Sequence, residues 1–98
     1  MPALRDYELV VIFNPNVSDE DVGKQMERVS QWITAGGGEI ANVSRWGRNR
    51  LAYPINHFRE GTYVAYQFRM RPEATTELER NVKLSEEIIR HLLVRLGE

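Results

Sequence analysis

The chain has 98 residues, 42% of them apolar, which fits one domain spanning residues 1–98 around a single core and excludes two domains. It contains no cysteine, which excludes a disulfide scaffold, a thiol nucleophile and Cys-ligated metal sites. No apolar run approaches the ~18 residues of a membrane helix, so a soluble cytoplasmic protein is expected. Its 13 lysines and arginines against 14 aspartates and glutamates give a net charge of −1, which argues at first against a nucleic-acid binder.

The first half of the chain predicts a strand, a helix and a second strand. Residues 7–13 are rich in β-branched and aromatic side chains and end at a turn sequence, so they are expected to form a strand. Ser18 is a good helix N-cap, and helical spacing of apolar residues continues until the glycines at 36–38, which predicts an amphipathic helix of about 18 residues. Residues 39–55 change the parity of their apolar positions near Gly47, which predicts one long strand with a bulge there.

The second half predicts a loop, a strand, a helix and a last strand. Residues 56–61 are expected to form a loop, and residues 62–70 alternate in polarity as a strand, so the second and third strands make a long hairpin. Pro72 is expected to start a helix that runs to about Leu84. Residues 88–96 are interpreted as the fourth strand, although the apolar spacing at their start also fits a continued helix.

This β-α-β-β-α-β order is the split βαβ pattern of α+β ferredoxin-like folds. Right-handed crossovers place both helices on one face of a four-stranded antiparallel sheet and leave the other face open. The open face and the hairpin are therefore the expected functional surfaces.

The sequence offers no catalytic constellation. His57 and His91 lack the spacing of metal ligands, and no serine lies in a nucleophile-elbow context. The three glycines at 36–38 follow a helix, whereas phosphate-cradling loops precede one. We therefore expect no enzyme activity, no metal, no cofactor and no small-molecule substrate.

Charge is distributed unevenly along the chain. Residues 40–72 carry six basic residues and one glutamate, a balance of +5, and every one of the six is arginine. The six are Arg45, Arg48, Arg50, Arg59, Arg69 and Arg71. Because the guanidinium group offers a planar fork of donors for phosphates and stacks on bases, this block favours RNA binding, with an ordinary solvated hairpin as the alternative. Residues 60–66 also loosely echo the signature of RNA-recognition motifs but depart from it at three positions.

Three segments, in this order, resemble the bacterial small-subunit ribosomal protein six family over essentially the whole chain: Arg5-Asp6-Tyr7-Glu8, Asn14-Pro15-Asn16 and Gly47-Arg48-Asn49-Arg50-Leu51-Ala52-Tyr53-Pro54-Ile55-Asn56. The resemblance implies a non-catalytic ferredoxin-like component of the small ribosomal subunit. It also implies binding to the central domain of small-subunit ribosomal RNA, together with small-subunit ribosomal protein eighteen as a heterodimer. Asn49 departs from the family, which commonly has a basic residue there.

The residues and the resemblance point to the same surface. Alternation puts Arg48 and Arg50 on one face of the second strand, and a bulge at Gly47 brings Arg45 to that side, so these arginines are expected to touch RNA phosphates and the partner. Trp46 is expected to pack against the partner protein, and Arg5 is a further candidate.

Two interpretations compete with this one. The apolar residues at 51, 53 and 55 are interpreted as simple core packing rather than as part of a binding surface. The alternative function is a ferredoxin-like small-molecule-binding module or dimeric enzyme, suggested by the open face and His57. An apolar, closed pocket that contains His57 and an acidic residue would favour that alternative.

Overall fold

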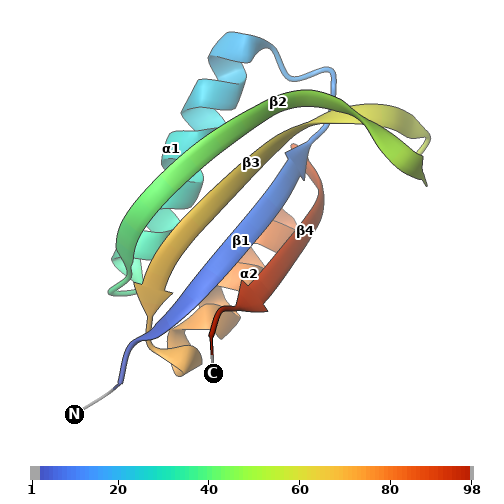
Figure 1. Ribbon diagram of the computed structural model, residues 1–98. Helices are drawn as coiled ribbons and strands as arrows, with labels where there is room; N and C mark the ends of the chain where they lie inside the picture. Colours follow the sequence, from blue (N-terminus) through green and yellow to red (C-terminus); the bar gives the residue numbers. More distant parts are fainter. Residues whose placement is uncertain (1–2, 98) are drawn as a thin grey trace.

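A computed structural model describes residues 3–97 and contains the expected order of elements. They are β1 (Arg5–Phe13), α1 (Asp19–Ala35), β2 (Glu39–Ile55), β3 (Phe58–Met70), a 3₁₀ turn (Pro72–Ala74), α2 (Thr75–Leu84) and β4 (Ile88–Arg95). The strands form one antiparallel sheet in the order β2-β3-β1-β4, and both helices lie behind it (Figure 1). The ferredoxin-like prediction is confirmed. Between residues 3 and 97, no helix combines the length and the apolar character needed to cross a membrane.

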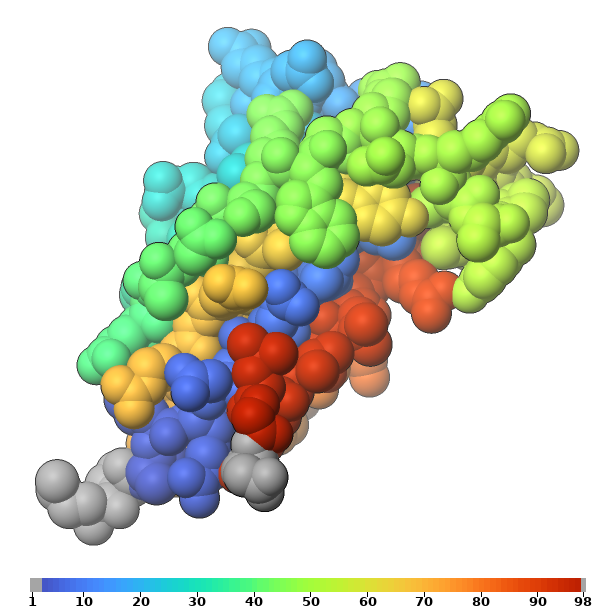
Figure 2. All heavy atoms as spheres, in the orientation of Figure 1, coloured from blue at the N-terminus to red at the C-terminus, as the bar shows by residue number. Residues whose placement is uncertain are grey.

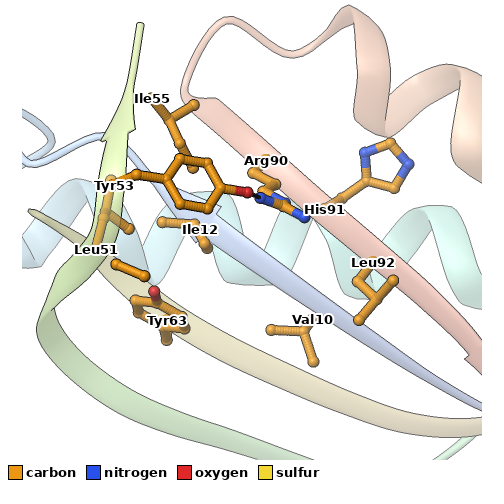
Figure 3. A pocket seen from close by; sticks show the side chains of 10 residues that line it. Val10, Ile12, Leu51, Tyr53, Ile55, Tyr63, Arg90, His91 and Leu92 are labelled. Atoms are coloured by element: carbon orange, nitrogen blue, oxygen red, sulfur yellow. Dashed lines mark hydrogen bonds between the residues drawn. The ribbon is translucent and has the colours of Figure 1, made fainter. Parts of the chain in front are cut away.

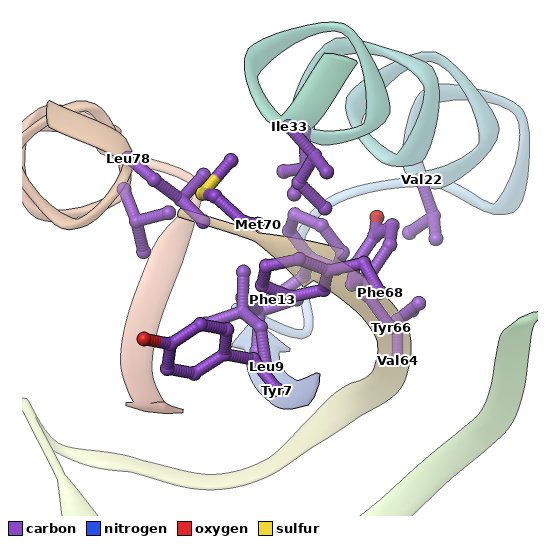
Figure 4. Close-up of a cluster of buried hydrophobic side chains, with 13 residues drawn as sticks. Tyr7, Leu9, Phe13, Val22, Ile33, Val64, Tyr66, Phe68, Met70 and Leu78 are labelled. Atoms are coloured by element: carbon purple, nitrogen blue, oxygen red, sulfur yellow. The ribbon is translucent and has the colours of Figure 1, made fainter. Parts of the chain in front are cut away.

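The core lies between the sheet and the two helices (Figure 4). Alternate residues of β1 and β3 point into it, as the predicted period of two requires, and α1 and α2 each add one apolar stripe. The largest fully buried side chain, Tyr66, donates a hydrogen bond from its hydroxyl to the Met26 carbonyl at 3.1 Å. Burial, with a smaller contribution from Glu27, raises the pKa of Tyr66 well above its usual range, so the buried phenol stays protonated.

Helix α1 begins and ends where the sequence predicts. The Asp21 backbone N–H donates to Ser18 Oγ at 3.2 Å, which satisfies one of the donors left open at the helix start. At the other end, the Gly38 N–H donates to the Ile33 carbonyl at 2.9 Å. A Cβ on Gly38 would lie 2.6 Å from Ile33 Cγ2, so only glycine lets the chain pass this closely into β2.

The predicted loop at residues 56–61 is wrong, because β3 already begins at Phe58. Asn56 and His57 alone make the turn, with φ angles of 50° and 72°. Turns with two positive φ values match the twist of a hairpin, and asparagine tolerates that region better than most residues. The continued helix considered for residues 84–92 is also wrong, since β4 begins at Ile88 and pairs with β1.

The bulge predicted at Gly47 is confirmed, and it changes the course of the hairpin. The pairing register shifts between Arg45, opposite Val64, and Gly47, opposite Tyr63, and Gly47 has a φ of +90°. Pairing stops again beyond Arg50 and resumes only at Ile55. The hairpin tip, defined here as residues 51–58, therefore leaves the plane of the sheet and curves toward its open face (Figure 1).

Candidate functional site

The bulge brings Arg45 and Arg48 to the same side of β2, because both lie opposite residues that are buried under the helices. Arg45 Nη2 lies 3.0 Å from Asp19 Oδ1 at the start of α1. Arg48 Nη2 donates to the Pro15 carbonyl at 2.7 Å, and its Nη1 lies 3.8 Å from Glu60 Oε1. Arg45 thus ties the hairpin to the first residue of α1 and Arg48 ties it to the turn before α1, and the side chain of each is still partly exposed to solvent.

Arg50 and Arg59 lie farther along the hairpin and differ from these two arginines. Both line a shallow depression on the tip, together with residues 51–54. Across residues 3–97, neither guanidinium forms an ion pair or a side-chain hydrogen bond. All five N–H donors of each side chain remain available to an anion such as a phosphate.

Arg5 is not brought to this site. It is the first residue of β1 and pairs with Met70, whereas Phe13, at the other end of β1, pairs with Thr62 opposite Arg48. Eight residues at about 3.3 Å each separate the two ends by about 26 Å. Two arginines of the basic block also lie at the far end and are neutralised there, Arg69 by Asp6 at 3.6 Å and Arg71 by Glu73 at 3.7 Å. The +5 block is therefore divided between two ends of the sheet.

The open face carries exposed apolar side chains near the hairpin. The rings of Trp46 and Tyr63 stack with centroids 6.2 Å apart and an interplanar angle of 14°, although Trp46 is still 53% exposed. Exposed leucine and valine side chains continue this surface at positions 92 and 94 of β4 and at position 96 just beyond it. Figure 2 shows this face, which is hollowed between the hairpin tip and β4.

The hollow is an apolar groove of about 240 Å³ under the hairpin tip (Figure 3). Leu51, Tyr53 and Ile55 line it from the tip, and Val10 and Leu92 line it from the sheet. The interpretation of Leu51, Tyr53 and Ile55 as core packing is wrong for Tyr53, which is 57% exposed, whereas Leu51 is buried and Ile55 is partly buried. The break in pairing beyond Arg50, which the sequence pattern does not reveal, turns this segment across the open face.

One contact joins the tip to β4 across the groove. Arg90 Nη1 donates to the Tyr53 hydroxyl, and the guanidinium carbon lies 5.8 Å from the centroid of the Tyr53 ring (Figure 3). Sequence reasoning missed Arg90, because 37 positions separate it from Tyr53 and only the fold brings the two together.

Neither histidine presents its imidazole ring to the groove. His57 lies in the turn, and the ring of His91 points away toward α2, where its Nε2 lies 3.2 Å from Glu79 Oε2 (Figure 3). No acidic residue lines the groove, and within residues 3–97 no group of histidine, aspartate and glutamate side chains could hold a metal ion. The arrangement expected of a small-molecule module or enzyme is therefore not found in the described part of the chain.

The chain is similar to one ribosomal protein family along nearly its whole length. Residues 6–95 match the family model described as ribosomal protein S6. A relative named small ribosomal subunit protein bS6 from Desulforamulus reducens is 40% identical, over 97% of this chain and 100% of the relative. Another of the same name, from Clostridioides difficile, is 42% identical over 93% of this chain and 98% of the relative.

Solved structures agree with these relatives. The crystal structure of 30S ribosomal protein S6 from Thermotoga maritima matches with a TM-score of 0.91 at 36% identity, covering 95% of this chain and 88% of that one. The C-terminal domain of the MgtC protein from Mycobacterium tuberculosis matches with a TM-score of 0.67 at 12% identity, covering 97% and 89% of the two chains. This second likeness concerns the fold alone.

Proposed function

Because the chain belongs to the ribosomal protein S6 family and is a component of the small ribosomal subunit, we propose that it binds the central domain of small-subunit ribosomal RNA as a heterodimer with small-subunit ribosomal protein eighteen. Its relatives are named as ribosomal proteins rather than as enzymes. The proposed role is accordingly structural and non-catalytic, with the basic hairpin on RNA and the apolar open face on the partner.

The observation that carries the RNA contact is the pair of unneutralised arginines on the hairpin. Arg50 and Arg59 keep every guanidinium donor available, and Arg48 keeps part of its own. An arginine that is paired with a carboxylate must give up that interaction before it can bind a phosphate. Arg50 and Arg59 have no such partner among the residues that the structure describes, so their binding to a phosphate carries no such cost. Arg45 contributes through the donors that its contact with Asp19 leaves unused.

The partner contact is proposed for the open face beside the hairpin. Trp46 and Tyr63 present a stacked aromatic pair there, and β4 adds leucine and valine side chains. Aromatic anchors surrounded by smaller apolar groups are typical of the centre of a protein–protein interface. Arg5 lies at the far end of the sheet, so it takes part in binding only if the partner protein or the RNA extends along the whole sheet.

A salt titration tests the RNA contact. Binding of the chain and its partner protein to a central-domain RNA fragment is measured between low and high salt for wild type, Arg48→Ala and Arg50→Ala. Each lost phosphate contact lowers the slope of log affinity against log salt by about one unit. Arg69→Ala is the matched control, since that exposed arginine lies at the far end of β3 beside Asp6.

The expected result is a smaller slope for Arg50→Ala than for wild type and an unchanged slope for Arg69→Ala. If both hairpin variants keep the affinity and the slope of wild type, the assignment of these arginines is wrong. If the wild-type chain neither binds the RNA with its partner nor co-sediments with small ribosomal subunits, the proposed function itself is wrong.

A further inference from the structure

The hairpin tip is not held in place by strand pairing. The ladder between β2 and β3 stops after Arg50 and Glu60 and resumes only for Ile55 and Phe58. A two-stranded ribbon without a packed face is marginally stable by itself. The direction in which the tip points therefore depends on what it touches outside the ladder.

A single side chain of β4 makes the polar part of that contact. Arg90 donates to the Tyr53 hydroxyl and lies 5.8 Å from the centre of its ring, so one guanidinium holds the tyrosine in two ways. The backbone of Arg90 is held by the sheet, because it lies opposite Ile12 in the β1–β4 ladder. Leu51 and Ile55, on either side of Tyr53 in the chain, line the same groove.

We propose that Arg90 is a positioning residue that latches Tyr53 and so fixes the hairpin tip in the orientation in which Arg50 and Arg59 meet RNA. The inference rests on the proposed function. Arg50 directly precedes the tip and Arg59 directly follows it, and both line one depression with Tyr53, so a tip that moves away from β4 changes the surface around both guanidinium groups. Arginine suits the latch because it combines a directed donor with a planar face, whereas lysine supplies only a point charge.

The alternative is that Arg90 binds a phosphate directly with its remaining donors. The two roles differ in their dependence on salt. A phosphate contact contributes to the slope of log affinity against log salt, whereas a positioning contact changes the affinity and leaves the slope alone when the charge is retained.

The test uses Arg90→Lys, which keeps the charge but loses the planar fork, and Tyr53→Phe, which removes only the hydroxyl. Each is expected to weaken binding of the chain and its partner to the central-domain RNA fragment by about tenfold at every salt concentration, the lower end of the range for one hydrogen bond to a charged group. The double variant is expected to be no weaker than either single one, because both break the same contact. Arg95→Lys, an exposed arginine farther along β4, is the control and is expected to match wild type.

Hydrogen exchange of the unbound chain provides the second measurement. Amides of residues 51–58 are expected to exchange faster in Arg90→Lys and Tyr53→Phe than in wild type, with the sheet amides and the thermal midpoint unchanged. Unchanged exchange at the tip in both variants overturns the latch, whatever the RNA result.

The outcomes separate the two proposals. A wild-type affinity for Tyr53→Phe, together with a slope lowered by about one unit in Arg90→Ala, makes Arg90 a phosphate contact and overturns its positioning role. Faster exchange at the tip with unchanged RNA affinity also overturns the positioning role, while the latch itself stands. A wild-type chain that binds no RNA refutes the proposed function instead, and the positioning role with it.

Discussion

Replacement of Gly47 by alanine tests whether the bulge needs a residue with positive φ. Gly47 has a φ of +90°, and a Cβ built on it meets no heavy atom within 4 Å. The whole cost of Gly47→Ala is therefore backbone strain, about 1–2 kcal/mol for an L-residue on the left-handed side. For a domain of this size, each kilocalorie lost lowers the thermal midpoint by about 4–8 °C.

Gly23→Ala is the matched control, because it adds the same methyl group at a second site with no atom within 4 Å. Gly23 lies inside α1, where alanine is favoured over glycine by about 0.5–1 kcal/mol, so this variant is expected to be more stable than wild type. Urea unfolding of both variants measures the two free energies of unfolding. If Gly47→Ala is as stable as wild type or more so, strain at the bulge is not what selects glycine there.

Two further predictions concern the buried face and the approach of two strands. The raised pKa of Tyr66 means that its phenol keeps its proton in the folded state above pH ~10, whereas the same tyrosine in the unfolded chain loses its proton there. The free energy of unfolding is therefore expected to fall above that pH, by up to about 1.4 kcal/mol per pH unit. Tyr66→Phe removes this part of the fall, and urea titrations across the alkaline range measure it. The same alkaline decline in the variant would contradict the assignment. The second variant, Gly61→Ala, places a Cβ 2.5 Å from Ile12 Cγ2 and 2.9 Å from the Phe13 carbonyl oxygen, so its free energy of unfolding is expected to be lower by about 1–3 kcal/mol. A normal thermal midpoint for this variant would show that β3 can shift away from β1 without cost.

Most of the fold follows from local patterns in the sequence. The alternation at 64, 66, 68 and 70 identifies a strand with one buried face, and the helix α1 is delimited by a capping serine and a run of glycines. The hairpin loop was mispredicted because residues 58–60 show no alternation of buried and exposed side chains. There the hairpin extends beyond the helices (Figure 1). The alternation of polar and apolar residues that identifies a half-buried strand is therefore lost in this part of the sequence.

The site was predicted only in outline. An arginine-rich hairpin and an exposed Trp46 follow from composition and parity, because a bulge moves side chains between faces in a known way. The engagement of Arg45 with Asp19 and of Tyr53 with Arg90 joins residues 26 and 37 positions apart. Such pairs depend on how the elements pack, which no local pattern in a single sequence records.

The order of strands in the sheet has a consequence for the nascent chain. β1 precedes the other strands in the chain, yet it occupies an inner position and pairs with β3 on one side and with β4 on the other. Its pairing with β4 is completed by a hydrogen bond from the Leu96 N–H to the Asp6 carbonyl at 2.8 Å. Until residues 88–95 emerge from the translating ribosome, one side of β1 presents an unpaired row of backbone donors and acceptors. The sheet therefore cannot be complete until β4 has been synthesised, although β1 precedes it by more than 70 residues.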